Sequence, residues 1–373
     1  MAVAGREDKR VFHGLDGLRG VAAVFVAMRH TAFFHNLGVH GGFLAVDLFF
    51  VLSGFVIAHA YERRLEKGMS AARFMALRYL RLWPVYVLGA VLGLIAAFDQ
   101  ALPGRDNLTT DQVIHTAPFA LMLLPGPHIK QMLYPVNSVA WSLALELLVN
   151  LIYAFVWRPL RDPRVLVAVL ATSALALIGA VVWFHKLDIG FTWTNAWGGL
   201  PRVAFSFTAG LGLYRLFKAR PWRSPLPAWA PLLILPPLFY VRVDEVIWPL
   251  ACVLVLFPAI VTTAAASQPG ARGARIFAWL GAVSYPLYAL HMPAGELMTA
   301  WMRHVSPQNV QNAWIGAAYL AVALAACALI ERFYDRPVRR WLTVLLDRVT
   351  GLAIGRAKPG PVATGDLVGD TQS

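Results

Sequence analysis

The feature that most constrains this chain is a succession of long apolar segments that continues along almost its whole length. A segment of about 20 apolar residues is long enough to cross the hydrocarbon core of a bilayer as one helix. With 58% apolar and only 14% charged residues, the chain is unlike an ordinary soluble protein. We therefore predict an all-α fold, a polytopic bundle of transmembrane helices.

We predict about ten spans, each close to the length that a bilayer crossing needs. They are Leu15–Leu37, Gly42–Tyr61, Tyr79–Phe98, Val139–Trp157, Val165–Phe184, Leu200–Phe217, Leu226–Val241, Val246–Ala265, Phe277–Trp301 and Trp314–Phe333. The seventh is rich in proline, which favours a broken or re-entrant path. Between the third and fourth spans, the loop Asp99–Asn137 is expected to hold an interfacial helix near Val113–Leu124. This loop is either a lid or acceptor-binding surface over a membrane site, or a plain connector.

Basic residues are distributed unevenly between the loops. The net charge is +13, and most Lys and Arg lie in alternate loops and in the C-terminal segment. Under the positive-inside rule this asymmetry places both termini in the cytoplasm and explains the charge better than nucleic-acid binding does. Residues 1–345 are expected to form one transmembrane domain, and residues 346–373 a cytoplasmic tail that is disordered.

The first span carries charge at two depths. Arg19 and His30 are eleven positions apart, so they share one helix face about 16 Å apart along the axis. Ionisable groups inside a membrane helix are costly and usually mark a functional site. The alternative is that Arg19 flanks the membrane and His30 is a packed polar residue.

Two acidic residues fall at a depth similar to that of His30. Asp47 lies in the second span and Glu146 in the fourth, and both are expected about two turns from the outer surface. A carboxylate that holds an imidazole fixes its tautomer and raises its basicity, as a general base for a hydroxyl requires. We therefore predict a catalytic layer of His30, Asp47 and Glu146.

A second cluster is expected at the cytoplasmic side. Arg78 and Arg81 lie almost one turn apart on one helix side, close to Arg19 and Asp16. Arginine side chains suit phosphate groups, so the cluster would clasp a nucleotide-bearing donor. The alternative is an ordinary basic flank of the membrane, which the positive-inside rule also produces.

Further polar groups inside the spans are candidates for supporting roles. Ser53, His291 and Glu331 are reasonable polar partners of the site. His35 and His40 would be a weak metal site, because no third ligand accompanies them. We therefore expect no metal.

Six motifs occur in order along the chain. They are Leu15-Asp16-Gly17-Leu18-Arg19-Gly20 with His30; Asp47 with Phe49-Phe50-Val51-Leu52-Ser53-Gly54-Phe55; Arg78 and Arg81 with Leu82-Trp83-Pro84-Val85-Tyr86; Trp141-Ser142-Leu143-Ala144-Leu145-Glu146; Ser284-Tyr285-Pro286-Leu287-Tyr288 through His291; and Glu331 with Pro337. With these motifs the chain resembles the membrane-bound acyltransferase-3 family over nearly its whole length. Ser142 and Tyr285 enter the supporting set through this resemblance.

The resemblance implies an O-acyltransferase of the bacterial inner membrane. Acyl-CoA, most commonly acetyl-CoA, would enter from the cytoplasm with its phosphates on Arg78, Arg81 and Arg19. The acceptor would be a hydroxyl of a cell-surface or lipid-linked carbohydrate, or of a small molecule such as a macrolide. His30 would be either the general base or a transient acyl carrier. The SGNH domain of the family's two-domain members is not expected here.

One hypothesis comes from a different functional class. Ten spans with charged residues inside them also suit a transporter or flippase for a glycan or lipid. Such a protein would move its substrate without depending on coenzyme A. The oligomeric state is not predicted.

Overall fold

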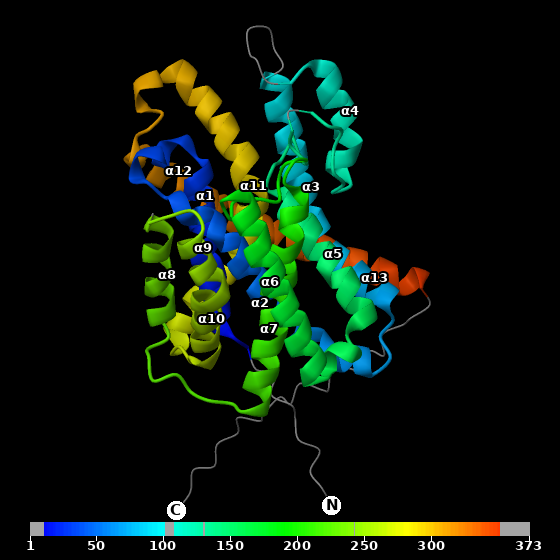
Figure 1. Ribbon diagram of the computed structural model, residues 1–373. Helices are drawn as coiled ribbons and strands as arrows, with labels where there is room; N and C mark the ends of the chain where they lie inside the picture. The colour runs from blue at the N-terminus through cyan, green and yellow to red at the C-terminus, as the bar shows by residue number, and fades with distance from the viewer. Residues whose placement is uncertain (1–10, 101–107, 130, 242, 351–373) are drawn as a thin grey trace, which may run out of the picture.

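The computed structural model describes residues 11–100, 108–129, 131–241 and 243–350. Within these ranges every extended regular element is a helix, and the only β pairing is at isolated bridges (Figure 1). The all-α prediction is confirmed. In chain order the α-helices are α1 (His13–His30), α2 (Ala45–Glu66), α3 (Ala71–Gln100), α4 (Thr110–Leu121), α5 (Ala140–Val156), α6 (Pro163–Phe184), α7 (Gly199–Ala219), α8 (Ala230–Tyr240), α9 (Ile247–Ala251), α10 (Phe257–Ala266), α11 (Ala271–Val305), α12 (Ala313–Ile330) and α13 (Arg336–Val349).

Each predicted span coincides with helical structure, and the loop between the third and fourth spans contains α4. Short helices complete the chain path: 3₁₀ turns at Ala32–Leu37 and His40–Leu44, and π-helical turns at Cys252–Leu256 and Glu331–Asp335. The proline-rich seventh segment forms only the short helix α8, as its prolines favour.

Five helical stretches in the described ranges are long and apolar enough to cross a membrane. They are His40–Glu66, Ala71–Asp99, Pro163–Phe184, Ile247–Ala266 and Ala313–Val349. Helix α5, like α8, is apolar but shorter. The number of ten spans and the side on which the termini lie therefore stay predictions.

Helices α1 and α11 are not among the five stretches that are long and apolar enough to cross a membrane. They pack against each other in the bundle (Figure 1). Helix α1 carries Asp16, Arg19 and Arg29, which lower its apolarity. The contact is close: a Cβ on Gly20 would lie 2.4 Å from the Leu280 side chain. A helix that is covered by other helices does not need an apolar surface, so a test of apolar length overlooks it.

Helices α2 and α7 cross with their backbones in contact. A Cβ on Gly54 would lie 2.0 Å from the carbonyl oxygen of Phe207, and a Cβ on Gly210 would lie 2.1 Å from that of Val51. No side chain larger than glycine fits at either position unless the helices separate. Small residues permit this close packing of helices in membranes.

Two loops join on the side of the bundle where α4 lies. The Leu133 amide donates to the Phe191 carbonyl at 3.1 Å, and the Trp193 amide donates to the Gln131 carbonyl at 2.8 Å. The Asn195 side chain accepts from the amides of Gly190 and Thr192, which fixes the turn. The long loop is therefore anchored at this point to the connection between α6 and α7.

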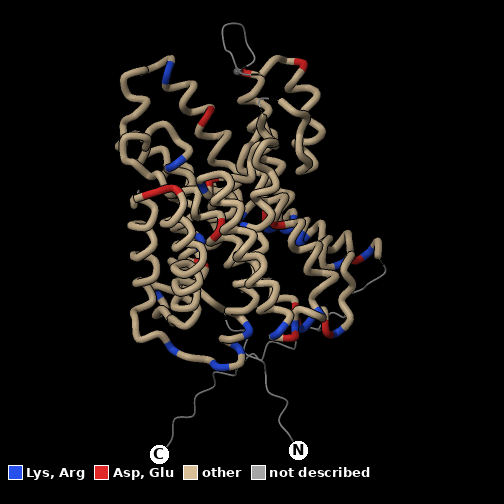
Figure 2. Tube along the Cα trace, in the orientation of Figure 1, with Lys and Arg blue, Asp and Glu red and all other residues tan. Residues whose placement is uncertain are grey.

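Basic residues gather at the opposite end. Figure 2 shows Lys and Arg concentrated around the lower helix ends and along α13, with few near α4. The expected domain boundary at residues 345 and 346 falls inside α13, which continues to Val349. The rest of the predicted tail, from Gly351, lies outside the described residues.

Candidate functional site

His30 lines a cavity of about 510 Å³, which we call the histidine cavity. Its walls come from α1, α2, α5 and α11, from the segment between α1 and α2 with its two 3₁₀ turns, and from both joined loops. Among the lining residues are Val46, Trp141, Asp188 and Tyr288. The volume is in the range of small-molecule binding sites.

The His30 ring is held by a carbonyl and by a second histidine. His30 Nδ1 lies 2.9 Å from the Val26 carbonyl oxygen and 3.2 Å from His291 Nε2. His291 Nδ1 lies 2.8 Å from the Tyr288 carbonyl and 3.2 Å from that of Leu287, so it must donate. In the neutral ring His291 Nε2 is then an acceptor, and His30 Nδ1 carries the proton. This assignment leaves a lone pair on His30 Nε2, as a general base needs.

The predicted contact of His30 with Asp47 or Glu146 is not found in the part of the chain that the structure describes, and the catalytic roles of these residues stay predictions. Within the described residues, no hydrogen bond joins His30 to Asp47 or Glu146; each carboxylate has an arginine partner instead. Depth along a helix was predicted from sequence position, but the direction in which each carboxylate points depends on its neighbours. His291, expected only as a supporting residue, contacts the His30 ring.

Asp47 forms a fully buried ion pair with Arg202 on α7. Their side chains are 0% exposed, and Arg202 donates to the two Asp47 oxygens at 2.6 and 3.2 Å. Arg202 also donates to the Ile189 carbonyl at 2.6 Å and lies over the Trp141 ring. A buried charge needs this full set of partners. The pair connects α2, α7 and the loop at Ile189 beside the histidine cavity.

The acidic residue that does line the histidine cavity is Asp188. Arg29 donates to Asp188 at 2.7 Å and to the His40 carbonyl, and its guanidinium lies over Phe43. Both side chains are only partly exposed. The rim of the cavity next to His30 therefore carries a paired charge, which the sequence analysis did not single out.

A second cavity of about 170 Å³, the arginine cavity, is lined by Arg19, Arg78 and Arg81. The predicted cationic cluster is thus brought together. Ser53, Ser142, Glu146 and Tyr285 line the same cavity.

Each of these guanidinium groups has an acidic neighbour. Arg78 donates to Glu146 at 2.6 Å, and Ser53 donates to the same oxygen at 3.0 Å. Arg19 lies 3.3 Å from Asp16, as the sequence suggested. Among the described residues, Arg78 Nε is buried without a hydrogen-bond partner.

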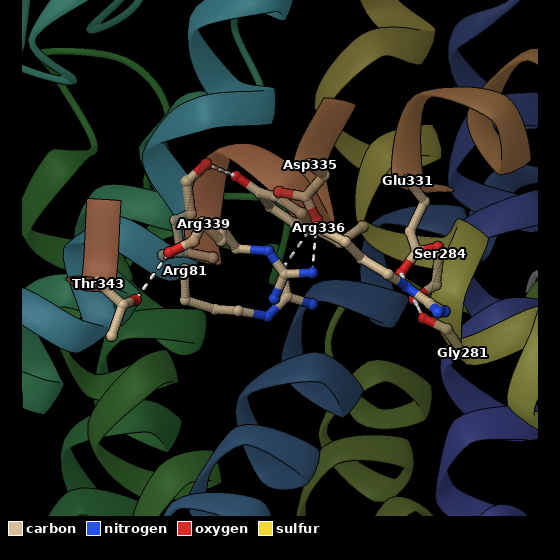
Figure 3. A network of polar contacts seen from close by, with 10 residues as sticks. Arg81, Gly281, Ser284, Glu331, Asp335, Arg336, Arg339 and Thr343 are labelled. Carbon is tan, nitrogen blue, oxygen red and sulfur yellow. Dashed lines mark hydrogen bonds and ion pairs between the residues drawn. The ribbon is translucent and has the colours of Figure 1, made fainter. Parts of the chain in front are cut away.

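Arg81 belongs to a polar network at the end of α12 (Figure 3). Asp335 lies 2.8 Å from Arg339 and 3.7 Å from Arg81, while Arg336 contacts Glu331. Arg81 also lies over the Tyr285 ring. Glu331 therefore faces Arg336, and Asp335 is the acidic neighbour of Arg81.

Ser142 and Tyr285 have defined contacts. The hydroxyls of Ser142 and Tyr288 share a hydrogen bond of 2.5 Å, and they lie 3.0 and 3.4 Å from the Val139 carbonyl oxygen. The Tyr285 hydroxyl donates to the Leu82 carbonyl. Both residues fix α11 against neighbouring helices.

Several residues of the site were missed by the sequence analysis. They are Arg29, Asp188, Arg202, Tyr288, Asp335 and Arg339. A charge inside an apolar segment could have indicated Arg202, and Tyr288 stood within a quoted motif without a role. In the ranges that the structure covers, no cluster of three metal-ligating side chains is found.

Comparison with known proteins gives consistent matches. A family model described as an acyltransferase domain matches residues 12–332. The chain is 40% identical over 184 residues to protein 2 in picA locus of Rhizobium radiobacter, across 46% of this chain and 94% of that protein. No solved structure matches.

Two longer alignments cover most of the chain. It is 26% identical to peptidoglycan O-acetyltransferase OatA of Listeria monocytogenes, over 90% of this chain and 57% of OatA. It is 25% identical to acyltransferase MdmB of Streptomyces mycarofaciens, over 88% of this chain and 92% of MdmB. The family match extends from the start of α1 to the π-helical turn after α12 and so includes both cavities. The chain therefore belongs to the acyltransferase-3 family and is an O-acyltransferase.

Proposed function

We propose that this protein transfers an acyl group, commonly acetyl, from acyl-CoA to a hydroxyl group of a cell-surface or lipid-linked carbohydrate. The observation that supports this most is the pair of adjoining cavities. One is lined by arginines and the other by a histidine with a lone pair, and two lining residues, Val46 and Tyr288, are common to both. A donor and an acceptor could thus meet from different cavities.

The arginine cavity suits the donor. Coenzyme A is far larger than about 170 Å³, so only its thioester end would enter, with its phosphates near the arginines. Guanidinium groups bind phosphate through charge-assisted hydrogen bonds. Arg78 Nε has no hydrogen-bond partner among the described residues and would bind a phosphate oxygen. Glu146 would hold the Arg78 side chain in place until acyl-CoA binds.

His30 would act as the general base in the histidine cavity. Its Nε2 would take the proton of the acceptor hydroxyl while the oxygen attacks the thioester carbonyl. The carbon–sulfur bond breaks and the ester carbon–oxygen bond forms. The proton then passes from His30 to the sulfur, which leaves as the coenzyme A thiol. His291 would keep His30 in the required tautomer.

The acceptor would enter the histidine cavity from the side of the joined loops. This cavity is larger, and its rim offers the Arg29–Asp188 pair and the Trp141 and Phe191 rings. Polar pairs beside aromatic rings suit a carbohydrate, which presents both hydroxyls and apolar faces. The carbohydrate acceptor named for OatA belongs to the same chemical class.

We further propose that the protein lies in the bacterial inner membrane with about ten spans and both termini in the cytoplasm. The support is the gathering of basic residues at one end of the bundle (Figure 2). This orientation would direct the arginine cavity toward cytoplasmic acyl-CoA and the joined loops outward.

The test uses inverted membrane vesicles that contain the full chain. Acetyl-CoA with a labelled acetyl group is added, and the label is followed into vesicle carbohydrate by mass spectrometry. We expect incorporation with the natural chain and none with His30→Ala. Equal incorporation in the two would refute the proposal, as would movement of a glycan across the membrane that is independent of coenzyme A.

A further inference from the structure

Val46 and Tyr288 line both cavities, although they come from different helices. Val46 lies in the first turn of α2, and Tyr288 lies in the middle of α11. Both are buried, at 7% and 5% exposure. These two side chains are therefore where the arginine cavity and the histidine cavity adjoin.

The Tyr288 ring is held from several sides. Its hydroxyl shares a hydrogen bond of 2.5 Å with the hydroxyl of Ser142 on α5. The edge of the Phe49 ring packs against it at 5.4 Å between centroids and an angle of 86°. The His291 ring lies 5.9 Å away on the other side. With both its ring and its hydroxyl fixed, Tyr288 is a rigid part of the wall that the two cavities share.

Val46 is the other residue that lines both cavities, and its neighbourhood is rigid as well. The next residue is Asp47, whose buried pair with Arg202 fixes this turn of α2. A valine side chain is also stiff, because its branched Cβ restricts χ1. The part of the wall that the two cavities share is therefore not readily reshaped by side-chain rotation.

We propose that Val46 and Tyr288 form the passage through which the acyl group crosses to His30, and that its width selects unbranched acyl groups. This rests on the proposed function, since it assumes that acyl-CoA enters the arginine cavity. A straight chain presents one methylene at a time to the passage. A chain branched next to the carbonyl presents two methyl groups at once and meets both rigid sides.

The experiment compares two isomeric donors, n-butyryl-CoA and isobutyryl-CoA, which have equal numbers of carbon atoms and differ only in shape. Release of the coenzyme A thiol by vesicles is measured with a thiol reagent, and the release by His30→Ala vesicles is subtracted. We expect the natural chain to favour the straight isomer by at least about tenfold, the scale on which a tight pocket rejects a misplaced methyl group.

The deciding variant is Val46→Ala, which should lower that preference about tenfold by raising the rate with the branched isomer. Val46→Ile is the opposite change and should slow both donors, the branched one more. Val51→Ala is the matched control, because Val51 is on the same helix and lines neither cavity. It should leave the ratio of the two rates unchanged.

Two results would overturn the inference: equal rates for the two isomers with the natural chain, or an unchanged ratio in Val46→Ala when protein levels match. These differ from failure of the proposed function, in which acetyl-CoA itself releases no thiol above the His30→Ala background.

Discussion

The two cavities differ in how their polar groups are held. In the histidine cavity, the His30 ring is positioned by a carbonyl and a neutral histidine. In the arginine cavity, every guanidinium faces a carboxylate. A neutral hydrogen-bonded setting suits a group that exchanges a proton, whereas ion pairs suit groups that exchange one anionic partner for another. The difference predicts separate kinetic effects for changes in each cavity.

The largest effect is expected from His30→Ala. It removes the base of the histidine cavity and should lower the turnover rate by about 10²–10⁴-fold. Labelled acetyl transfer by vesicles measures this, with the protein amount checked by immunoblotting. The Michaelis constant for the donor should change little. Undiminished transfer in this variant would remove the histidine cavity from the chemistry.

Asp47→Asn tests whether Asp47 is structural. It leaves the Arg202 charge buried without its partner, which should cost about 3–5 kcal/mol of stability. Thermal unfolding in detergent measures the loss. The double variant Asp47→Asn with Arg202→Gln should recover part of it, because both charges are then gone. An unchanged unfolding temperature in the single variant would contradict the structural role.

His291→Phe should lower the turnover rate about 10- to 100-fold, because His30 Nδ1 loses one of its two contacts. The pH–rate profile separates positioning from general destabilisation: its acidic limb should move in this variant. His59→Phe is the matched control, since His59 lines neither cavity, and its profile should match that of the natural chain. Identical profiles for all three proteins would argue against positioning by His291.

Arg78→Ala acts on the other cavity. Loss of a charge-assisted hydrogen bond should raise the Michaelis constant for acetyl-CoA by roughly tenfold or more. Initial rates at varied donor concentration measure this. Arg78→Ala leaves the Glu146 carboxylate without its partner. The double variant Arg78→Ala with Glu146→Gln removes that charge and so separates its effect from the loss of Arg78. A donor Michaelis constant equal to that of the natural chain would leave Arg78 as part of the basic flank.

The smallest effect is expected for Arg81→Ala, a rise in the same constant of about threefold or less. Arg81 is partly exposed, at 35% of its side chain, and shares Asp335 with Arg339. The separation of 3.7 Å makes this pair weak, and Arg339, at 2.8 Å, keeps Asp335 paired when Arg81 is removed. Donor titrations at low and high salt provide the measurement. An effect as large as that of Arg78→Ala would show that the two arginines act alike.

The sequence predicted where the helices lie because apolar length is a local property. Arg19 and His30 could be placed on one helix face because both lie in α1. The clustering of Arg19 with Arg78 and Arg81 also followed, since each lies in the N-terminal half of its helix. These predictions required no knowledge of how one helix is rotated against another.

Partners between helices could not be predicted in the same way. Asp47 pairs with Arg202, which is 155 positions away, and Tyr288 pairs with Ser142 across two helices. Such contacts depend on which face each helix turns to its neighbour. Hydropathy constrains this poorly in a bundle whose inner helices carry polar residues, so the contact of His30 with a carboxylate was predicted incorrectly.

The glycine crossing of α2 and α7 has a consequence for larger movements. Val46, Asp47 and Ser53 all belong to α2, on one side of Gly54, and Arg202 belongs to the helix that Gly54 touches. Because the two backbones meet there with no room for a side chain, they can tilt about this point more easily than they can slide or part. Gly54 and Gly210 would then be the pivot of a tilting motion between α2 and α7. A tilt that widens the histidine cavity would change the arginine cavity at the same time.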